Sequence, residues 1–457
     1  MSTIAAISTA PGIGGIGIVR MSGEEAFSIL GEIFKPKKSF NIEEVKGYTI
    51  KYGYIVKEDE IIDEVLVSFF RAPNSYTTEN LCEISSHGGA YVVRRILETC
   101  LENGADLAEP GEFTKRAFLN GRMDLSQAEA VIDIINARTE KEAKTSINQL
   151  EGSLSKQIKQ IREMLMSVMV EIEVSIDYPE YDVEEVSNSK AYNMLLEARN
   201  RLSSLKDSFE NGKIIKNGIK IALLGKPNAG KSSLLNAILK EERAIVTDIE
   251  GTTRDTIEES ITVSGIPIHI IDTAGIRNAT NEVEKIGIEK SRKMAEEAEL
   301  VIAILDASKV LNDEDIEILE LLKNKKGIVV LNKIDLGNIK VSKEAIKNIA
   351  GEKEIIEISA KENIGIDNIY ETITKMFELN EINIDNDAII TNIRHKDIIS
   401  NAIKECKKAL EATKEKMPID IIGIYIKDIM EDLGKITGES VSDEIIKEIF
   451  SKFCLGK

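Results

Sequence analysis

The spacing of hydrophobic positions changes several times along the chain. Residues 1 to about 118 contain short apolar runs, including "TIAAIS", "IGIVRM" and "EVLVSFF", separated by turns rich in glycine and proline. Such runs are typical of β-strands. From about 120 to 213 the spacing is helical, and one seam steps by four and three residues through Leu154, Ile158, Ile161, Leu165, Val168 and Ile172. This seam predicts the core of a helix bundle. "DYPEYD" at 177–182 interrupts it, and a second helical stretch is expected from about 188 to 210.

Strand and helix patterns alternate between residues 217 and about 378. The apolar runs are "IKIALL", "IPIHII", "LVIAIL", "GIVVL" and "EIIEI". This alternation predicts a parallel sheet with crossover helices. After residue 385 helical spacing returns at Ile399, Ile403, Cys406 and Leu410. We therefore predict a multidomain α/β and α protein in which an α/β domain is inserted into a discontinuous helical domain. The expected boundaries are 1–118, 119–215, 216–379 and 380–457.

Composition narrows the class of protein. The chain has 59 basic and 78 acidic residues and a net charge of −19, a poor balance for binding nucleic acid alone through phosphates. A local basic groove or a basic partner is still compatible with it. The four cysteines show no CxxC spacing and the three histidines are scattered, so neither a disulfide framework nor a metal site is visible. No apolar run approaches the ~18 residues of a membrane span. No basic segment precedes the first apolar stretch, so we expect a cytoplasmic protein without a membrane partner.

The segment "GKPNAGKS" at 225–232 fits the phosphate-binding loop G-x-x-x-x-G-K-[ST]. It follows a predicted strand and begins a predicted helix. Glycines let backbone N–H groups approach phosphate oxygens, Lys231 neutralises their charge, and the Ser232 hydroxyl can bind Mg²⁺. The predicted nucleotide contacts in this loop are Asn228, Ala229, Gly230, Lys231, Ser232 and Ser233.

Two further motifs predict that the base is guanine. In "NKID" the carboxylate of Asp335 accepts hydrogen bonds only. It can bind the N1–H and N2–H groups of guanine, whereas adenine presents an acceptor at N1. Asn332 and Lys333 can support the loop, and Ser359 and Ala360 of "SAK" can complete the base pocket. Motifs at successive strand ends lie on the ligand-binding edge of such a sheet, so the predicted nucleotide is GTP.

The catalytic segments are less complete. "DTAG" supplies Asp272, Thr273, Ala274 and Gly275, and "TDIEGTTRD" supplies Thr247, Asp248, Ile249, Glu250, Gly251, Thr252 and Thr253. Asp272 can hold the Mg²⁺ shell, the Gly275 N–H can meet the γ-phosphate, and Thr253 can bind Mg²⁺ from a switch loop. Ras-type proteins carry a water-orienting glutamine at the position of Ile276. An isoleucine cannot orient water, so another group must do so.

These motifs, the opening "TIAAISTAPGIGGIGIVR" and the ending Cys-x-Gly-Lys together resemble the MnmE (TrmE) family of tRNA-modification GTPases over the whole chain. The resemblance implies a Ras-like G domain whose K⁺ ion replaces an arginine finger. Its ligands would be Asn228, Thr247, Ile249 and Thr252. It also implies a homodimer whose G domains meet face to face, and it places the water-orienting glutamate at Glu284. From the residues alone, a solvated helix carboxylate is the preferred interpretation of Glu284.

"GIGGIG" at 12–17 matches the dinucleotide pattern G-x-G-x-x-G, but a strand-like run follows it where a helix is required. We therefore predict a glycine-rich β-turn. By resemblance, this region is an α+β domain that dimerises and binds a one-carbon tetrahydrofolate, either the 5-formyl or the 5,10-methylene derivative. The contacts implied are Arg20, Glu83 and Arg122, although the family often has lysine at the position of Arg122.

The chain ends in "FCLGK" after a predicted amphipathic helix. Ser442 is a possible N-cap, and Ile445, Ile446, Ile449, Phe450 and Phe453 fall on one helix face. An anchored helix would hold Cys454 at its end. By resemblance, the tail extends toward the folate site across the dimer, with Lys457 near the folate. Whether Cys454 acts as nucleophile, proton donor or neither is open, and an incidental thiol on a plain helix is the alternative.

The resemblance implies a GTPase that works with the FAD-containing MnmG in a heterotetramer and on tRNA. FAD would belong to the partner alone. The pair would add an aminomethyl or carboxymethylaminomethyl group at C5 of the wobble uridine, position 34. The competing hypothesis is a ribosome-assembly GTPase of the Era or Der type, which would need a basic KH domain with a GXXG loop after the G domain. No such loop is evident after residue 378. A filament-forming GTPase would leave the N-terminal region and the tail unexplained.

Overall fold

The computed structural model describes residues 1–177, 184–240, 259–271, 292–382 and 388–457. Their contacts divide the chain into two compact units, each discontinuous in sequence. The first unit contains Met1–Ile132, Gln149–Leu202 and Ile398–Lys457, and the second contains Asp133–Asn148 and Ser203–Asp397. The multidomain α/β and α architecture is thus confirmed. The predicted boundaries at 118, 215 and 379 stay a prediction.

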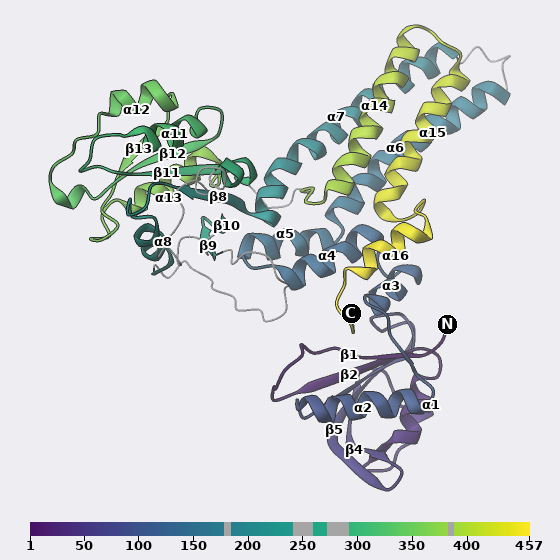
Figure 1. Ribbon diagram of the computed structural model, residues 1–457. Helices are drawn as coiled ribbons and strands as arrows, with labels where there is room; N and C mark the ends of the chain where they lie inside the picture. Colours follow the sequence, from purple (N-terminus) through teal and green to yellow (C-terminus); the bar gives the residue numbers. More distant parts are fainter. Residues whose placement is uncertain (178–183, 241–258, 272–291, 383–387) are drawn as a thin grey trace. The chain divides into compact units, whose positions relative to one another are not determined.

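A seven-stranded sheet begins the first unit, in the order β3-β4-β5-β6-β2-β1-β7. Its strands are β1 (Ile4–Ile7), β2 (Gly17–Ser22), β3 (Phe34–Pro36), β4 (Thr49–Lys57), β5 (Glu60–Phe70), β6 (Leu81–Ser86) and β7 (Asp106–Leu107). Helices α1 (Ala26–Ile33) and α2 (Ala90–Glu102) pack on one face. The three apolar runs quoted above lie in β1, β2 and β5, as predicted (Figure 1).

The glycine-rich segment 12–17 connects two antiparallel strands. β1 pairs with β2, with Ala6 opposite Arg20. Gly12 has a φ of 137°, a conformation that favours glycine. A dinucleotide fingerprint would place a helix directly after the glycines. Because β2 follows instead, the segment is not a dinucleotide fingerprint, as predicted, although it forms a longer loop with bends and no regular β-turn.

Long helices form the rest of the first unit (Figure 1). The helices outside the two sheets' segments are α3 (Glu112–Leu119), α4 (Leu125–Asn136), α5 (Glu140–Leu150), α6 (Ser153–Asp177), α7 (Glu184–Asn217), α14 (Ile393–Lys414), α15 (Ile419–Thr437) and α16 (Asp443–Ser451). Most of α5 and the C-terminal part of α7 belong to the second unit. All six positions of the predicted seam are at most 2% exposed on α6. The four predicted core positions of α14 are also buried. The helix predicted over 188–210 is longer at each end, because α7 spans 184–217.

The α/β sheet of the second unit has the order β13-β12-β11-β8-β10-β9. Its strands are β8 (Ile219–Leu224), β9 (Glu259–Val263), β10 (Ile266–Ile271), β11 (Leu300–Asp306), β12 (Gly327–Asn332) and β13 (Glu354–Glu357), and its helices include α8 (Lys231–Lys240), α11 (Asp313–Leu322), α12 (Lys343–Ala350) and α13 (Ile366–Met376). The predicted strands pair in parallel. The edge strand β9 was not predicted. It is antiparallel to β10 through a turn at Ser264 and Gly265, which both have positive φ.

Residues 133–148 belong to the α/β unit although they precede its sheet by some distance in sequence. The Lys216 ammonium lies 2.7 Å from the Asp133 carboxylate. Lys141 donates a hydrogen bond to the Leu379 carbonyl oxygen at 2.9 Å, at the end of the segment that follows α13. Within the part of the chain that the structure describes, no helix has the length and apolar character needed to cross a membrane.

Candidate functional site

The predicted phosphate-binding loop connects β8 to α8. A side chain at Gly225 would place its Cβ 2.6 Å from the Ile304 carbonyl oxygen. At Gly230, where φ is +106°, a Cβ would lie 2.0 Å from the Asn332 amide nitrogen. The backbone therefore passes closer to its neighbours than any residue with a side chain allows. Asn228 also has a positive φ, of 63°, and is exposed on this loop.

Lys231 begins α8 and points its ammonium back over the loop. Its Nζ donates to the carbonyl oxygens of Gly225 and Lys226. Burial lowers the pKa of Lys231 below its ordinary 10.5. A partly buried ammonium beside carbonyl dipoles fits an anionic ligand, since a phosphate would offset the cost of that burial. Ser232 and Ser233 follow it on the exposed first turn of α8.

Asn332, the last residue of β12, connects three of the predicted loops. Its side-chain amide donates to the Ala229 carbonyl oxygen at 2.9 Å. Its side-chain oxygen accepts from the Ala360 backbone N–H at 3.0 Å. Asn332 is 2% exposed, so both bonds are shielded from water. The phosphate-binding, "NKID" and "SAK" loops are thereby fixed at one edge of the sheet.

Asp335 and Ser359 are adjacent at the same edge. The Ser359 hydroxyl donates to the Asp335 carboxylate at 2.7 Å and is fully buried, whereas Asp335 is exposed. One carboxylate oxygen is thus held by protein while the residue keeps a solvent-facing side. This arrangement leaves an oriented acceptor with which a guanine edge can pair.

Asp306 at the end of β11 is a residue that the sequence analysis missed. Its carboxylate accepts from the Lys333 ammonium at 2.7 Å and from the Ser308 hydroxyl at 2.7 Å. Burial raises the pKa of Asp306, but the hydrogen bonds from Lys333 and Ser308 outweigh it and leave the pKa below 3.8. The ion pair fixes Lys333, whose own φ is 71°. Asp306 directly follows the apolar run "LVIAIL". The other motifs were found because they also follow apolar runs, so the same signal could have identified Asp306.

A second contact that the sequence analysis missed is made by Lys226, near the start of the phosphate-binding loop. Lys226 donates to the Asp315 carboxylate at 2.6 Å and to the Asn312 side-chain oxygen at 2.9 Å. Asn312 and Asp315 form a capping box at the start of α11. The loop is thus tied to a helix terminus as well as to Asn332.

Several predicted residues lie outside the part that the structure describes. They are Thr247, Asp248, Ile249, Glu250, Gly251, Thr252, Thr253, Asp272, Thr273, Ala274, Gly275 and Glu284. β10 ends at Ile271, so the "DTAG" motif directly follows a strand, as the sequence predicts. The roles of these residues stay predictions.

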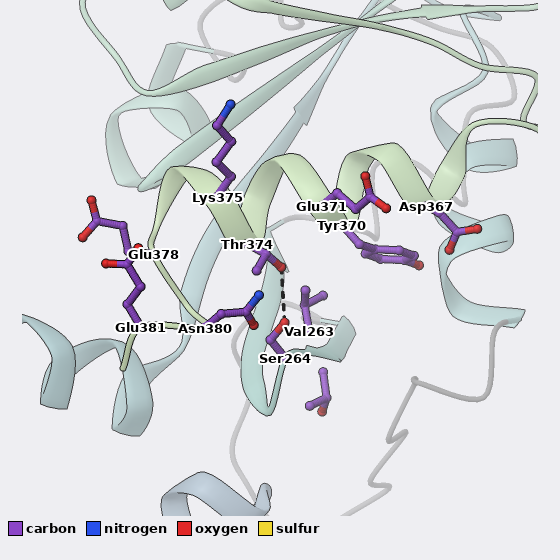
Figure 2. A pocket seen from close by; sticks show the side chains of 11 residues that line it. Val263, Ser264, Asp367, Tyr370, Glu371, Thr374, Lys375, Glu378, Asn380 and Glu381 are labelled. Atoms are coloured by element: carbon purple, nitrogen blue, oxygen red, sulfur yellow. Dashed lines mark hydrogen bonds between the residues drawn. The ribbon is translucent and has the colours of Figure 1, made fainter. Parts of the chain in front are cut away.

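The described α/β unit also contains a groove of about 1010 Å³ between the β9–β10 turn and α13 (Figure 2). Carboxylates of Asp367, Glu371, Glu378 and Glu381 line it, and a hydrogen bond of 3.3 Å between Ser264 and Thr374 crosses it. None of the predicted nucleotide residues is among the described residues that line it. An acidic lining opposes phosphate binding, so this groove is distinct from the nucleotide site.

Arg20 is the centre of a second cluster, in the first unit. β2 and β6 pair so that Arg20 lies opposite Glu83. The guanidinium Nε and Nη2 atoms donate to one Glu83 oxygen at 2.9 and 2.8 Å. The rings of Tyr76 and Phe113 lie 5.4 and 5.5 Å from the Arg20 Cζ atom. The pair is thus oriented by the sheet register and by two aromatic rings.

Arg122 approaches the same cluster through Tyr76. Its Cζ atom lies 4.7 Å from the centre of the Tyr76 ring, and its guanidinium donates to the Tyr76 carbonyl oxygen at 3.2 Å. Arg122 is exposed. Arg122 and Arg20 therefore both lie against the Tyr76 ring. Tyr76 was not among the predicted residues.

The helix before the tail forms as predicted, with two differences. α16 buries Ile446 and Phe450, and Phe450 contacts Phe118 and Phe453 at ring distances of 6.3 and 5.2 Å. Ile445, predicted on the apolar face, is 42% exposed, which makes that assignment wrong. Ser442 is the N-cap residue, but its side chain makes no cap hydrogen bond.

The tail itself returns to the Arg20 cluster of the same chain. The Arg20 Nη1 atom donates to the Gly456 carbonyl oxygen at 3.1 Å, across 436 positions of sequence. Burial lowers the pKa of Lys457, as does the charge of Arg20, while Glu83 and Cys454 act in the opposite direction. Among the four cysteines, Cys454 is exposed and the others are buried. Arg20, Glu83 and Lys457 therefore lie together, with Cys454 near them.

Comparisons with known proteins cover the entire chain. A family model described as the MnmE helical domain matches residues 125–454, and one described as the GTP-binding protein TrmE N-terminus matches residues 3–122. The tRNA modification GTPase MnmE of Acetivibrio thermocellus is 49% identical over 457 residues, which are 100% of this chain and 99% of that protein. The proteins of the same name from Clostridioides difficile and Thermoanaerobacter pseudethanolicus are also 49% identical, with the same coverage. Among solved structures, the G domain of the FeoB iron transporter of T. maritima aligns at 25% identity over 34% of this chain and 97% of its own, with a TM-score of 0.26.

Proposed function

The chain belongs to the MnmE family of tRNA modification GTPases, and from this premise we propose that it acts at C5 of the wobble uridine of tRNA, position 34. In this proposal the chain hydrolyses GTP and, with MnmG, adds an aminomethyl or carboxymethylaminomethyl group derived from a tetrahydrofolate one-carbon unit. The observation that carries the nucleotide part is the connection of three loops by the buried Asn332.

GTP would bind along the edge of the sheet that these loops form. Lys231 would neutralise phosphate charge, and the close backbone at Gly225 and Gly230 would let N–H groups reach the phosphate oxygens. Asp335, oriented by Ser359, would select guanine. The Asp306–Lys333 pair would keep the base loop in place.

Two metal ions are part of the proposal. Ser232 and Thr253 would hold Mg²⁺, and Asn228, Thr247, Ile249 and Thr252 would hold K⁺. Bound there, the cations would supply charge stabilisation next to the phosphates, in place of an arginine finger. Asn228 is exposed on the phosphate loop, so its side chain can bind an ion that residues of another segment also bind. Glu284 would orient the attacking water, and paired G domains of a homodimer would complete the switch loop.

The Arg20 cluster supports the one-carbon part. Glu83 can accept from the amino and ring N–H groups of a pterin, whereas Arg20, Arg122 and Lys457 can pair with the carboxylates of a folate tail. The donor set fits such a ligand, because one carboxylate and two cations lie together beside aromatic rings. When bound, the folate would supply the one-carbon unit. Cys454 lies near Lys457. A role of its thiol in the one-carbon reaction is therefore part of the proposal.

The remaining parts of the proposal concern partners and location. MnmG would contribute FAD and much of the tRNA-binding surface, in a cytoplasmic heterotetramer. A net charge of −19 fits a chain that relies on a partner to bind tRNA. The competing hypothesis, ribosome assembly of the Era or Der type, gains no support, because the family match of the helical domain continues to residue 454.

The test is to delete the gene in its host and measure wobble-uridine nucleosides of bulk tRNA by mass spectrometry. We expect loss of the C5-aminomethyl family of nucleosides. The intact chain should restore them, and so should a control variant, Lys323→Ala, which changes an exposed lysine at the end of α11. Lys231→Ala and a chain lacking residues 454–457 should not restore them.

Unchanged nucleosides together with a ribosome-subunit defect would overturn the proposal in favour of an assembly GTPase. Restoration by the chain without residues 454–457 would remove the tail from the chemistry. A further measurement tests the use of tetrahydrofolate separately from GTP hydrolysis. In cells grown in medium depleted of one-carbon donors, the modified nucleosides should decrease although the intact chain is present.

A further inference from the structure

The tail is held against the sheet by contacts from three different segments. The Ser8 hydroxyl, just after β1, donates to the Gly456 carbonyl oxygen at 3.1 Å, and Arg20 donates to the same oxygen at 3.1 Å. The Gly111 backbone N–H donates to the Cys454 carbonyl oxygen at 3.3 Å. Phe453, directly before Cys454, is 6% exposed. A tail with this many anchors has a defined position.

Gly456 fits this position because it has no side chain. Its φ is +81°, and a Cβ there would lie 2.3 Å from the Ile7 carbonyl oxygen. That oxygen belongs to the backbone of β1 and cannot move aside as a flexible side chain could. Gly456 is buried although Leu455 beside it is 58% exposed. The backbone of the tail, more than its side chains, therefore makes the contact.

The shared carbonyl oxygen connects the tail to the Arg20–Glu83 pair. Arg20 uses its Nε and Nη2 atoms for Glu83 and its Nη1 atom for Gly456. Any displacement of Gly456 changes what Arg20 binds, and it also moves the flanking Cys454 and Lys457. Ser8 supplies the second donor to that oxygen.

We propose that Ser8 and Gly456 are positioning residues that fix Cys454 and Lys457 relative to the Arg20–Glu83 pair. The proposal rests on the one-carbon reaction proposed above. Ser8 acts through the Gly456 carbonyl oxygen and does not itself contact the substrate. Its hydroxyl is needed as a donor, so threonine can replace it and alanine cannot.

The first measurement is hydrogen exchange of the full-length chain, followed by mass spectrometry of peptides that contain Gly111 or residues 452–457. We expect Ser8→Ala to accelerate exchange at the Gly111 amide roughly three- to tenfold, the effect of losing one hydrogen bond. Gly456→Ala should accelerate it further. Ser8→Thr should restore the wild-type rate, because it restores the donor.

Gly351→Ala is the matched control for Gly456→Ala. Gly351 has nearly the same φ, +80°, and no heavy atom within 4 Å of a Cβ built on it. It therefore imposes a similar backbone strain without the close contact. We expect Gly351→Ala to leave exchange at Gly111 unchanged.

The second measurement is the rate of tRNA modification by the chain with its flavoprotein partner. Ser8→Ala should lower kcat roughly three- to tenfold and leave the KM for tRNA and the GTP hydrolysis rate unchanged. Ser8→Thr should restore kcat. A purely structural role of Ser8 would not separate kcat from GTP hydrolysis in this way.

Two results would overturn the inference. Unchanged Gly111 exchange in Ser8→Ala and Gly456→Ala would mean that these contacts do not hold the tail. Faster exchange with normal kcat would mean that the position of the tail does not matter for the reaction. If the wild-type chain itself fails to modify tRNA while its tail is protected from exchange, the proposed function fails and the docking of the tail stands.

Discussion

The nucleotide site and the Arg20 cluster are assembled in different ways. The proposed nucleotide site consists of loops that follow strands of one sheet, and Asn332 connects three of them through hydrogen bonds to Ala229 and Ala360. The Arg20 cluster joins β2, β6 and a tail 436 positions away from Arg20. In the first site the geometry follows from the order of strands. In the second it depends on where α16 places the end of the chain.

This difference predicts that the two sites fail independently. A change in a nucleotide loop should remove nucleotide binding and leave the tail docked. A change at the Arg20 cluster should alter the one-carbon reaction and leave GTP hydrolysis intact. The predictions below run from the largest expected effect to the smallest.

Lys231→Ala should lower GTP hydrolysis about 10³-fold, because it removes the cation beside the phosphates and leaves the carbonyl oxygens of Gly225 and Lys226 facing them. Hydrolysis is measured as phosphate release, and binding with a fluorescent GDP. Lys323→Ala is the control for a lost surface charge. Accelerated exchange at Gly111 in Lys231→Ala would contradict the independence of the two sites.

Asp335→Asn should weaken GTP binding about 10²-fold or more, since the negative charge is removed and one of the two acceptor oxygens becomes an amide donor that faces the guanine N2–H. The asparagine amide can donate to the 2-oxo group of xanthine, so XTP should bind better than GTP. The measurement is competition of GTP and XTP against a fluorescent nucleotide. An unchanged preference for GTP would mean that another residue selects the base. Ser359→Ala should also weaken GTP binding, but less than Asp335→Asn does, because Ser359 only orients the Asp335 carboxylate.

The loops of the proposed nucleotide site that the structure describes could be placed from sequence, because they follow strands that the apolar runs identify. The nucleotide contacts of their residues stay predictions. The residues that the sequence analysis missed at this site form ion pairs between different loops. Asp306 and Asp315 each pair with a lysine from another segment, and no spacing along the chain records such a pair. The edge strand β9 was missed for a similar reason. Its register depends on pairing with β10 through a tight turn, while its own sequence, "ESITV", has few apolar positions.

The grouping of Arg20, Glu83 and Lys457 was indicated only by the family resemblance, and its role as a folate site stays a proposal. Arg20 and Glu83 become partners because β2 and β6 pair in one register. The anchoring of the tail depends on Ser8 and Gly111, and no spacing along the chain records their contacts with residues 454–456. The predicted apolar face of α16 and the residues after it was right at Ile446, Phe450 and Phe453, which pack with side chains of α3 and α4. It was wrong at Ile445, which is exposed.

Glu83→Gln should weaken binding of a reduced folate about tenfold, because it removes the charge that Arg20 pairs with while keeping the size of the side chain. Isothermal titration with 5-formyltetrahydrofolate measures it. Glu98→Gln, an exposed change on α2, is the matched control. GTP hydrolysis should stay at the wild-type rate in both variants. A tenfold loss of hydrolysis in Glu83→Gln alone would show that the two sites are coupled and would break the comparison.

The smallest effect is expected at His87, in the loop between β6 and α2. Its Nδ1 atom lies 2.8 Å from the Asp63 carboxylate, and this hydrogen bond raises the pKa of His87 above 6.5. A raised pKa means that the pair stabilises the fold fully below pH 6.5 and that this contribution disappears as pH rises through the folded-state pKa. Because the side chain of His87 is 73% exposed, solvent screens the pair, and the thermal midpoint of Asp63→Asn should hardly differ from that of the wild type.

NMR titration of the imidazole should still give a pKa above 6.5 in the wild type and a value nearer 6.5 in Asp63→Asn. A titration that is identical in the two proteins would mean that the ion pair does not persist in solution. The mutation should leave both GTP hydrolysis and folate binding unchanged, since neither site uses His87.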